Sequence, residues 1–306
     1  LGPGGHRKSL LRAAADAAIG LQIVPQVACR PIVSEWNFVT PVILDTWALF
    51  APVRAATSEA ALRRIYADAE FRREFRAEVE GRGGRDAAFS GGSLEGESRR
   101  QSWTHTEISF YPGHPELEGR GLYELAAERG VHACDLALSI ALDSGLKARF
   151  RTPIVNFDED EVEELITHPN VVLGLGDGGA HMSQLCDACY ATHLLGHWVR
   201  EKNAIALETA IHMITGRTAA LFGITDRGTL AVDRPADIVI FDRDRIAAGP
   251  LERVHDLPAG ADRLISKPQG IHTVICNGTI LPPPGAAWPP GLTLPGRLLR
   301  GGRAAG

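Results

Sequence analysis

The sequence lacks an apolar run of the roughly 20 residues that a transmembrane helix needs. Residues 1–9 also lack the charged head and apolar core of a signal peptide. The chain has only five cysteines, an odd number, which favours reduced thiols over a disulfide framework. We therefore expect a soluble, cytoplasmic protein with no membrane partner.

Local concentrations of positive charge are also absent. The net charge is −5, and the basic residues are almost all arginines scattered along the chain. A nucleic-acid-binding surface needs a basic stripe that follows a phosphate backbone, so we expect no nucleic-acid partner. By contrast, 44% of the 306 residues are hydrophobic, enough to bury a large core in one large domain or two smaller ones.

The first part of the chain alternates between helical and strand-like patterns. The helical segment 10–19 precedes the apolar run 21–27, which predicts a buried strand after a helix. The run 171–176 is a short apolar segment bounded by turn residues, as in a strand covered on both faces. Further helices are predicted over 58–80, 121–129, 133–143, 158–167, 193–200, 204–215 and 217–222. The alternation predicts an α/β domain over residues 1–223.

Other stretches have a different composition. Residues 81–98 are rich in Gly, Ser and Arg and predict a long exposed loop inserted in the first domain. Short β runs at 228–241 and 272–280, with turns at 233–235 and at Asn277 and Gly278, predict a small β module over residues 224–281. Residues 282–306 are rich in Pro, Gly and Arg, and we expect a draped or disordered tail.

One carboxylate directly follows a predicted buried strand, in the stretch VVLGLGDGGAH at residues 171–181. Catalytic groups of a parallel α/β barrel converge at the carboxyl ends of its strands, so we expect Asp177 at a catalytic rim. Gly178 and Gly179 allow a sharp turn and leave room for a ligand beside the carboxylate. His181 can reach a substrate from the same loop. An Asp that caps the next helix gives the same local pattern and stays an alternative.

Three stretches carry a family resemblance: GLGDGGAH, the run 204–242 with its TGRTAALFG, RGTL and PAD segments, and IHTVICNGTIL near the end. They are similar to the amidohydrolase superfamily and most resemble the N-acyl-D-amino-acid deacylases of amidohydrolase family 3. The resemblance implies a distorted (β/α)8 TIM-type barrel with an appended β-sandwich, of which this chain is expected to be the carboxyl-terminal part. It also implies a zinc cofactor, as one or two divalent ions, and a small-molecule amide substrate.

The resemblance also implies a set of metal ligands: an His-x-His pair, a Cys or modified Lys, two further His and one Asp. Only the Asp maps here, onto Asp177, and none of the eleven histidines forms an His-x-His pair. We therefore expect most metal ligands, and the first six barrel strands, outside this chain. Asp177 is the expected metal ligand and the carboxylate that passes the proton of a metal-bound water to the leaving amine.

Other polar residues have competing interpretations. Arg30 follows the first predicted strand and is a candidate for binding a substrate carboxylate, with a structural ion pair as the alternative. Cys186 and Cys189 form a lone CxxC, which without a second pair favours ordinary cysteines over a zinc site or redox pair. His193 and His197 have the spacing of a metal pair on one helix face, but ordinary packing explains that spacing more often.

The first functional interpretation is hydrolysis of a non-peptide C–N bond, with deacylation of an N-acyl-D-amino acid as the specific reaction. His193 stands where the deacylases carry an Arg that grips the substrate carboxylate, which leaves the substrate open. The second interpretation is a cyclic amidohydrolase similar to dihydroorotases and hydantoinases. The third is a truncated, non-catalytic remnant that acts as an interaction module. The sequence does not indicate an oligomeric state.

Overall fold

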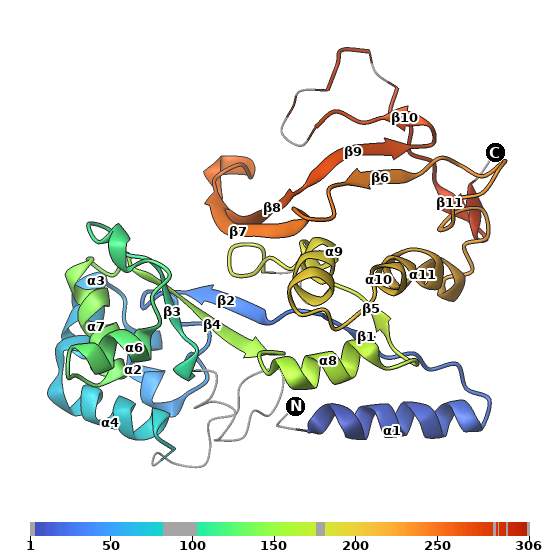
Figure 1. Ribbon diagram of the computed structural model, residues 1–306. Helices are drawn as coiled ribbons and strands as arrows, with labels where there is room; N and C mark the ends of the chain where they lie inside the picture. Colours follow the sequence, from blue (N-terminus) through green and yellow to red (C-terminus); the bar gives the residue numbers. More distant parts are fainter. Residues whose placement is uncertain are drawn as a thin grey trace. The chain divides into compact units, whose positions relative to one another are not determined.

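The chain divides into two compact units built from interleaved segments. Unit 1 consists of Leu1–Arg12, Pro31–Glu161 and Ala180–Leu185, and unit 2 of Ala13–Arg30, Val162–Gly179 and Cys186–Gly306. The computed structural model (Figure 1) describes residues 4–81, 103–175, 181–283, 286, 288–291 and 293–304. Most of the predicted loop at 81–98 lies outside the described residues.

Unit 1 combines helices with an antiparallel three-stranded sheet of order β2-β4-β3. Its strands are β2 (Ile32–Trp36), β3 (Glu107–Phe110) and β4 (Arg149–Val155). Its helices are α2 (Ala51–Ala55), α3 (Glu59–Ala67), α4 (Ala69–Val79), α6 (Leu122–Glu128) and α7 (Ala133–Asp143), with the short 3-10 turns η1 (Ala48–Phe50) and η2 (Pro115–Leu117). The predicted α/β class is therefore confirmed for this unit.

The helix predicted over 58–80 is two helices, because Asp68 ends α3 and begins α4. Its carboxylate accepts a hydrogen bond from the backbone N–H of Phe71 at 2.9 Å, as an N-cap residue does. The core of this unit contains a cluster of aromatic rings among aliphatic side chains. Phe38 lies edge-on to both Trp36 and Tyr66, with ring centroids 5.1 Å apart in each pair. Such edge-on pairs add to the stabilisation from buried area.

Unit 2 contains a parallel pair of two-residue strands, β1 (Gln26–Val27) and β5 (Val172–Leu173). The helices associated with it are α9 (Tyr190–His193), the π-helical segment η3 (Leu194–Glu201), α10 (Leu207–Ile214) and α11 (Gly216–Leu221). Two helices, α1 (Gly5–Ala18) and α8 (Glu159–Thr167), have residues in both units. None of the helices in the described ranges has the length and apolar composition that crossing a bilayer requires.

The strand predicted over 21–27 is too long. Only Gln26–Val27 is a strand, and Leu21 and Ile23 are each 49% exposed. A strand extends only as far as a partner pairs with it, and β5 offers two residues. The run 171–176 was predicted to be a strand covered on both faces. Val171, Val172 and Leu173 of this run are all buried.

The β module in unit 2 has two separate sheets. Strands β6 (Ile238–Phe241), β9 (Ile271–Cys276) and β10 (Thr279–Ile280) form an antiparallel sheet of order β10-β9-β6. The hairpin of β7 (Ala247–Val254) and β8 (Arg263–Gln269) forms the other, with the turn η4 (Pro258–Gly260) between its strands. The turn predicted at Asn277 and Gly278 is confirmed, since both residues have positive φ, 45° and 81°.

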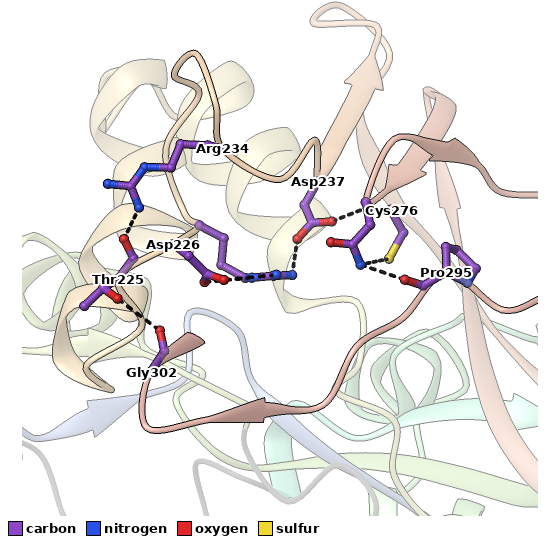
Figure 2. Close-up of polar contacts among 9 residues, drawn as sticks. Thr225, Asp226, Arg234, Asp237, Cys276, Pro295 and Gly302 are labelled. Carbon is purple, nitrogen blue, oxygen red and sulfur yellow. Dashed lines mark hydrogen bonds and ion pairs between the residues drawn. The ribbon is translucent and has the colours of Figure 1, made fainter. Parts of the chain in front are cut away.

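The described part of the tail is held against this module (Figure 2). It ends in the small hairpin of β11 (Leu299–Arg300) and β12 (Arg303–Ala304). The backbone N–H of Thr225 donates to the carbonyl of Gly302 at 2.7 Å, and the Asn277 amide donates to the carbonyl of Pro295 at 2.7 Å. These bonds attach the tail at two points.

Candidate active site

The central candidates of the sequence analysis, Asp177, Gly178 and Gly179, lie outside the described residues. Their roles stay predictions. The chain that leads to them is described as far as Leu175, two residues before Asp177. The chain that follows them is described from His181 onward.

The parallel strands β1 and β5 position the chain that leads to Asp177. Their registers pair Gln26 with Val172 and Val27 with Leu173, so the two carboxyl ends lie side by side. Beyond the strands, the N–H of Gly174 donates to the carbonyl of Val27 at 3.0 Å. The side-chain amide of Gln26 donates to the carbonyl of Leu175 at 2.9 Å. The contact of β5 with β1 therefore continues to Leu175.

Arg30 occupies a largely buried position three residues after β1. Its Nη1 donates to the carbonyl of Cys186 at 3.3 Å and also contacts the Sγ of Cys189. Its Nε lies 3.7 Å from the Oδ1 of Asp187, and the two side chains are 14% and 4% exposed. The structure thus forms the ion pair that was the structural alternative for Arg30, whereas substrate binding by Arg30 stays a prediction.

Two cysteines of this region, Cys29 and Cys186, lie where burial opposes ionisation of the thiol. All five cysteines of the chain are free thiols and lie within the described ranges. Burial raises the pKa of the Cys29 thiol to about 12, and burial also raises the pKa of Cys186. A thiol that stays protonated is a poor nucleophile and a poor metal ligand. For Cys186, this environment supports the interpretation as an ordinary cysteine.

His181 is an exposed residue of unit 1 with a left-handed backbone, φ 49°. Its carbonyl accepts hydrogen bonds from the N–H groups of Gln184 at 2.7 Å and Leu185 at 3.1 Å, which close a turn. The exposed imidazole is accessible to a ligand. Its role in substrate binding stays a prediction.

His193 and His197 stack on one another along α9 and η3, with ring centroids 4.9 Å apart. The Nδ1 of His197 also lies 3.1 Å from a carboxylate oxygen of Glu201. In the ranges that the structure describes, no three His, Cys, Asp or Glu side chains are grouped so that they could hold a metal ion. The two histidines therefore stack on each other, and His197 also contacts Glu201. Within the described ranges, this group does not form a set of three metal ligands.

The partners of Arg30 in the turn at 186–189, and the contact of Gln26 with Leu175, could not be predicted from sequence patterns. These partners lie 149 to 159 residues away along the chain. No local pattern identifies contacts over such separations. In the sequence, Arg30 was recognisable as a candidate only because it lies just after a predicted strand.

Comparisons with known proteins show which proteins this chain resembles. The chain is 31% identical over 175 residues to the D-aminoacylase of Alcaligenes xylosoxydans xylosoxydans, covering 56% of this chain and 33% of that protein. It is 32% identical over 196 residues to the N-acyl-D-glutamate deacylase of the same organism, covering 63% of this chain and 36% of that protein. The chain thus spans about a third of the length of these relatives.

Among solved structures, the chain is similar to the N-acyl-D-glutamate deacylase of Bordetella bronchiseptica, crystallised with zinc and a phosphonate inhibitor. The TM-score is 0.46 and the identity 23%, over 97% of this chain and 46% of that one. The sequence itself matches the model of the Amidohydrolase family at residues 134–282. The predicted resemblance is therefore confirmed: residues 134–282 are similar to the amidohydrolase family, and the curated relatives that the chain resembles include a D-aminoacylase and an N-acyl-D-glutamate deacylase.

Proposed function

We propose that this protein is a metal-dependent hydrolase of a non-peptide amide bond. The observation that carries the proposal is the match of residues 134–282 to the amidohydrolase family. The identities of 31% to a D-aminoacylase and 32% to an N-acyl-D-glutamate deacylase support N-acyl-D-amino acids as the substrate class. The products of that reaction are a carboxylate and a D-amino acid.

The proposal assigns β1 and β5 to a (β/α)8 barrel and the sheet of β6, β9 and β10 to an appended β-sandwich. The parallel pairing of β1 with β5 supports the barrel, because neighbouring barrel strands run parallel. The carboxyl ends of barrel strands form the catalytic face. Asp177 follows the carboxyl end of β5 by four residues in the sequence, which supports its place in the active site.

Asp177 is the proposed proton-transferring carboxylate. Hydrolysis adds the hydroxyl of water to the acyl carbon, breaks the C–N bond and gives the remaining proton to the leaving nitrogen. A carboxylate beside that water accepts its proton and then delivers it to the amine. Gly178 and Gly179 are proposed to leave space for the substrate beside Asp177, with His181 as a further substrate contact.

Zinc is the proposed cofactor, since a bound divalent ion supplies a water of lowered pKa and polarises a carbonyl. The described residues do not fit this ion by themselves, because no three potential ligands are grouped within those ranges. Asp177 is the one ligand that we propose from this chain, and it rests on the family resemblance alone.

A substrate panel tests the proposed function. The protein, supplied with zinc, is incubated with N-acetyl-D- and N-acetyl-L-forms of several amino acids and with a hydantoin as a cyclic amide, and free amine is measured. We expect release of amine from the N-acetyl-D-amino acids. Turnover of the hydantoin alone would instead make the protein a cyclic amidohydrolase. A zinc-loaded protein that hydrolyses none of these amides contradicts the proposal.

A further inference from the structure

A pocket in unit 1 is formed by the loop that follows β2, by α2 and by the first turn of α3. We call it the α2–α3 pocket. All of its lining residues lie between positions 39 and 62, so it belongs to one unit and consists of described residues only. Its volume of about 370 Å³ lies in the range of about 300–1,000 Å³ that is typical of small-molecule sites.

Part of the lining of the α2–α3 pocket is aliphatic. Val53 and Leu62 are 5% and 6% exposed and belong to the core of unit 1. Val42 is partly buried against the same core, whereas Val39 is 44% exposed. A branched aliphatic group in the pocket would cover this surface, and the burial of apolar area favours its binding.

Arg54 brings a positive charge to the same pocket in a fixed orientation. Its guanidinium donates twice from Nη1, to the backbone carbonyl of Trp47 at 3.1 Å and to that of Asp45. Nη1 has two hydrogens, one for each carbonyl. The edge formed by Nε and Nη2 is left, and no carboxylate of the described ranges pairs with it. Such an edge binds a carboxylate through two parallel hydrogen bonds.

Two carboxylates line the pocket together with this cation. They belong to Asp45 and Glu59, which are both exposed. The charged groups of the lining are thus one guanidinium and two carboxylates. A ligand with a carboxylate alone would be repelled by the two acids, and a ligand with an ammonium group alone would leave the free edge of Arg54 unused. A zwitterion complements both signs of charge.

We propose that the α2–α3 pocket binds a free α-amino acid with a branched aliphatic side chain. Such a molecule carries its two charges on neighbouring groups, and the pocket offers opposite charges on two neighbouring residues, because Arg54 contacts the backbone of Asp45 itself. The ligand carboxylate binds the Nε–Nη2 edge of Arg54, its ammonium group lies beside the Asp45 carboxylate, and its side chain packs on Val39 and Val42. Because two carbonyls already hold Arg54, little of its freedom is lost on binding. This inference does not depend on the proposed function.

A ligand-observed NMR titration of the zinc-free, 306-residue chain tests the site. The ligands are L-leucine, D-leucine and two analogues that each lack one charge, isocaproate and isoamylamine. We expect leucine to bind with a Kd on the order of 1 mM or below, as its small size allows. Each analogue should bind about 10-fold more weakly or worse, because each loses one charge-assisted contact. The two enantiomers show which configuration the pocket accepts.

Two substitutions test the two charges of the pocket separately. Arg54→Gln removes the edge that binds the carboxylate, and Asp45→Asn removes the negative charge while the backbone carbonyl stays. We expect each to weaken leucine binding by about 10-fold. Asp45→Asn should also narrow the difference between leucine and isocaproate, because the ammonium group has lost its partner. The matched control is Arg73→Gln on α4, which removes an exposed arginine paired with Glu70 and should leave binding unchanged.

The outcomes decide the proposal without any measurement of activity. Leucine binding that is unchanged in both Arg54→Gln and Asp45→Asn overturns it, because the ligand then binds elsewhere on the chain. The failure of both enantiomers to bind at about 20 mM also overturns it. Tighter binding of isocaproate than of leucine contradicts the zwitterion and shows an anion site. If thermal melting shows that Arg54→Gln does not fold, Asp45→Asn decides the question, because its exposed side chain can be changed without loss of the carbonyl that holds Arg54.

Discussion

The indole nitrogen of Trp198 and the backbone carbonyl of Cys29 form a 2.6 Å hydrogen bond inside the core of unit 2. Trp198 is 1% exposed and Cys29 is fully buried. The bond closes a contact between η3 and the end of β1 across 169 positions of sequence. A buried carbonyl that loses such a donor has no water to replace it.

Trp198→Phe should therefore destabilise the protein while keeping an aromatic ring in the core. We expect the free energy of unfolding to fall by about 1–3 kcal/mol, from the unsatisfied carbonyl together with the smaller ring. Chemical denaturation followed by circular dichroism measures this difference. Trp288→Phe is the matched control, because Trp288 is 49% exposed and its replacement should change stability little. Equal effects of the two substitutions would contradict the importance of the buried bond.

Gly174 and Gln26 should show energetic coupling. Alanine at position 174 places a Cβ where the Gln26 amide lies, so the side chain must leave the carbonyl of Leu175. We expect Gly174→Ala and Gln26→Ala each to cost about 1 kcal/mol of stability, from the same lost hydrogen bond. Because the loss is shared, the double variant should cost less than the sum of the two. Strict additivity in a double-mutant cycle would show that the two residues act independently.

The buried thiol of Cys29 predicts a loss of stability in alkali. Burial raises its pKa to about 12 in the folded protein, from an ordinary value of 9.0. The folded state thus holds this proton more tightly than the unfolded state does. The stabilisation is complete below the unfolded pKa and is lost as the pH rises from about 9 toward about 12.

Urea unfolding over this alkaline range, in the wild type and in Cys29→Ser, measures the contribution of Cys29. We expect a smaller decrease of stability with pH in Cys29→Ser, because serine does not ionise there. Cys276→Ser, at a half-buried cysteine of the β module, serves as the control. A pH dependence that is the same in Cys29→Ser and the wild type would be evidence against this linkage.

Elements with strong local signals were predicted well from the sequence. The helix predicted over 133–143 is α7 (Ala133–Asp143), because its continuous apolar and helix-forming residues need no distant partner to be recognised. The hairpin turn at Asn277 and Gly278 likewise depends on two residues that accept positive φ. In contrast, the strand at 21–27 was predicted too long, since strand length depends on the partner β5.

The candidate site was predictable only in part. The strand–Asp–Gly–Gly pattern makes Asp177 a prediction because the pattern is local, and the motifs around residues 204–242 indicate the resemblance to the amidohydrolase family. The partners of Arg30 could not be predicted, because Asp187 is brought to it by folding and not by sequence proximity. Such tertiary contacts also determine whether an arginine after a strand forms a structural ion pair or binds a substrate.

The most direct test of the account is the activity of Asp177→Asn. Asparagine preserves the size of the side chain but cannot take up a proton from water. With zinc supplied and an N-acetyl-D-amino acid as substrate, we predict that kcat falls by about 100- to 10,000-fold relative to the wild type. Asp244→Asn, at an exposed carboxylate beyond β6, should retain wild-type activity. Comparable turnover by Asp177→Asn and the wild type would contradict the central claim that this carboxylate carries the reaction.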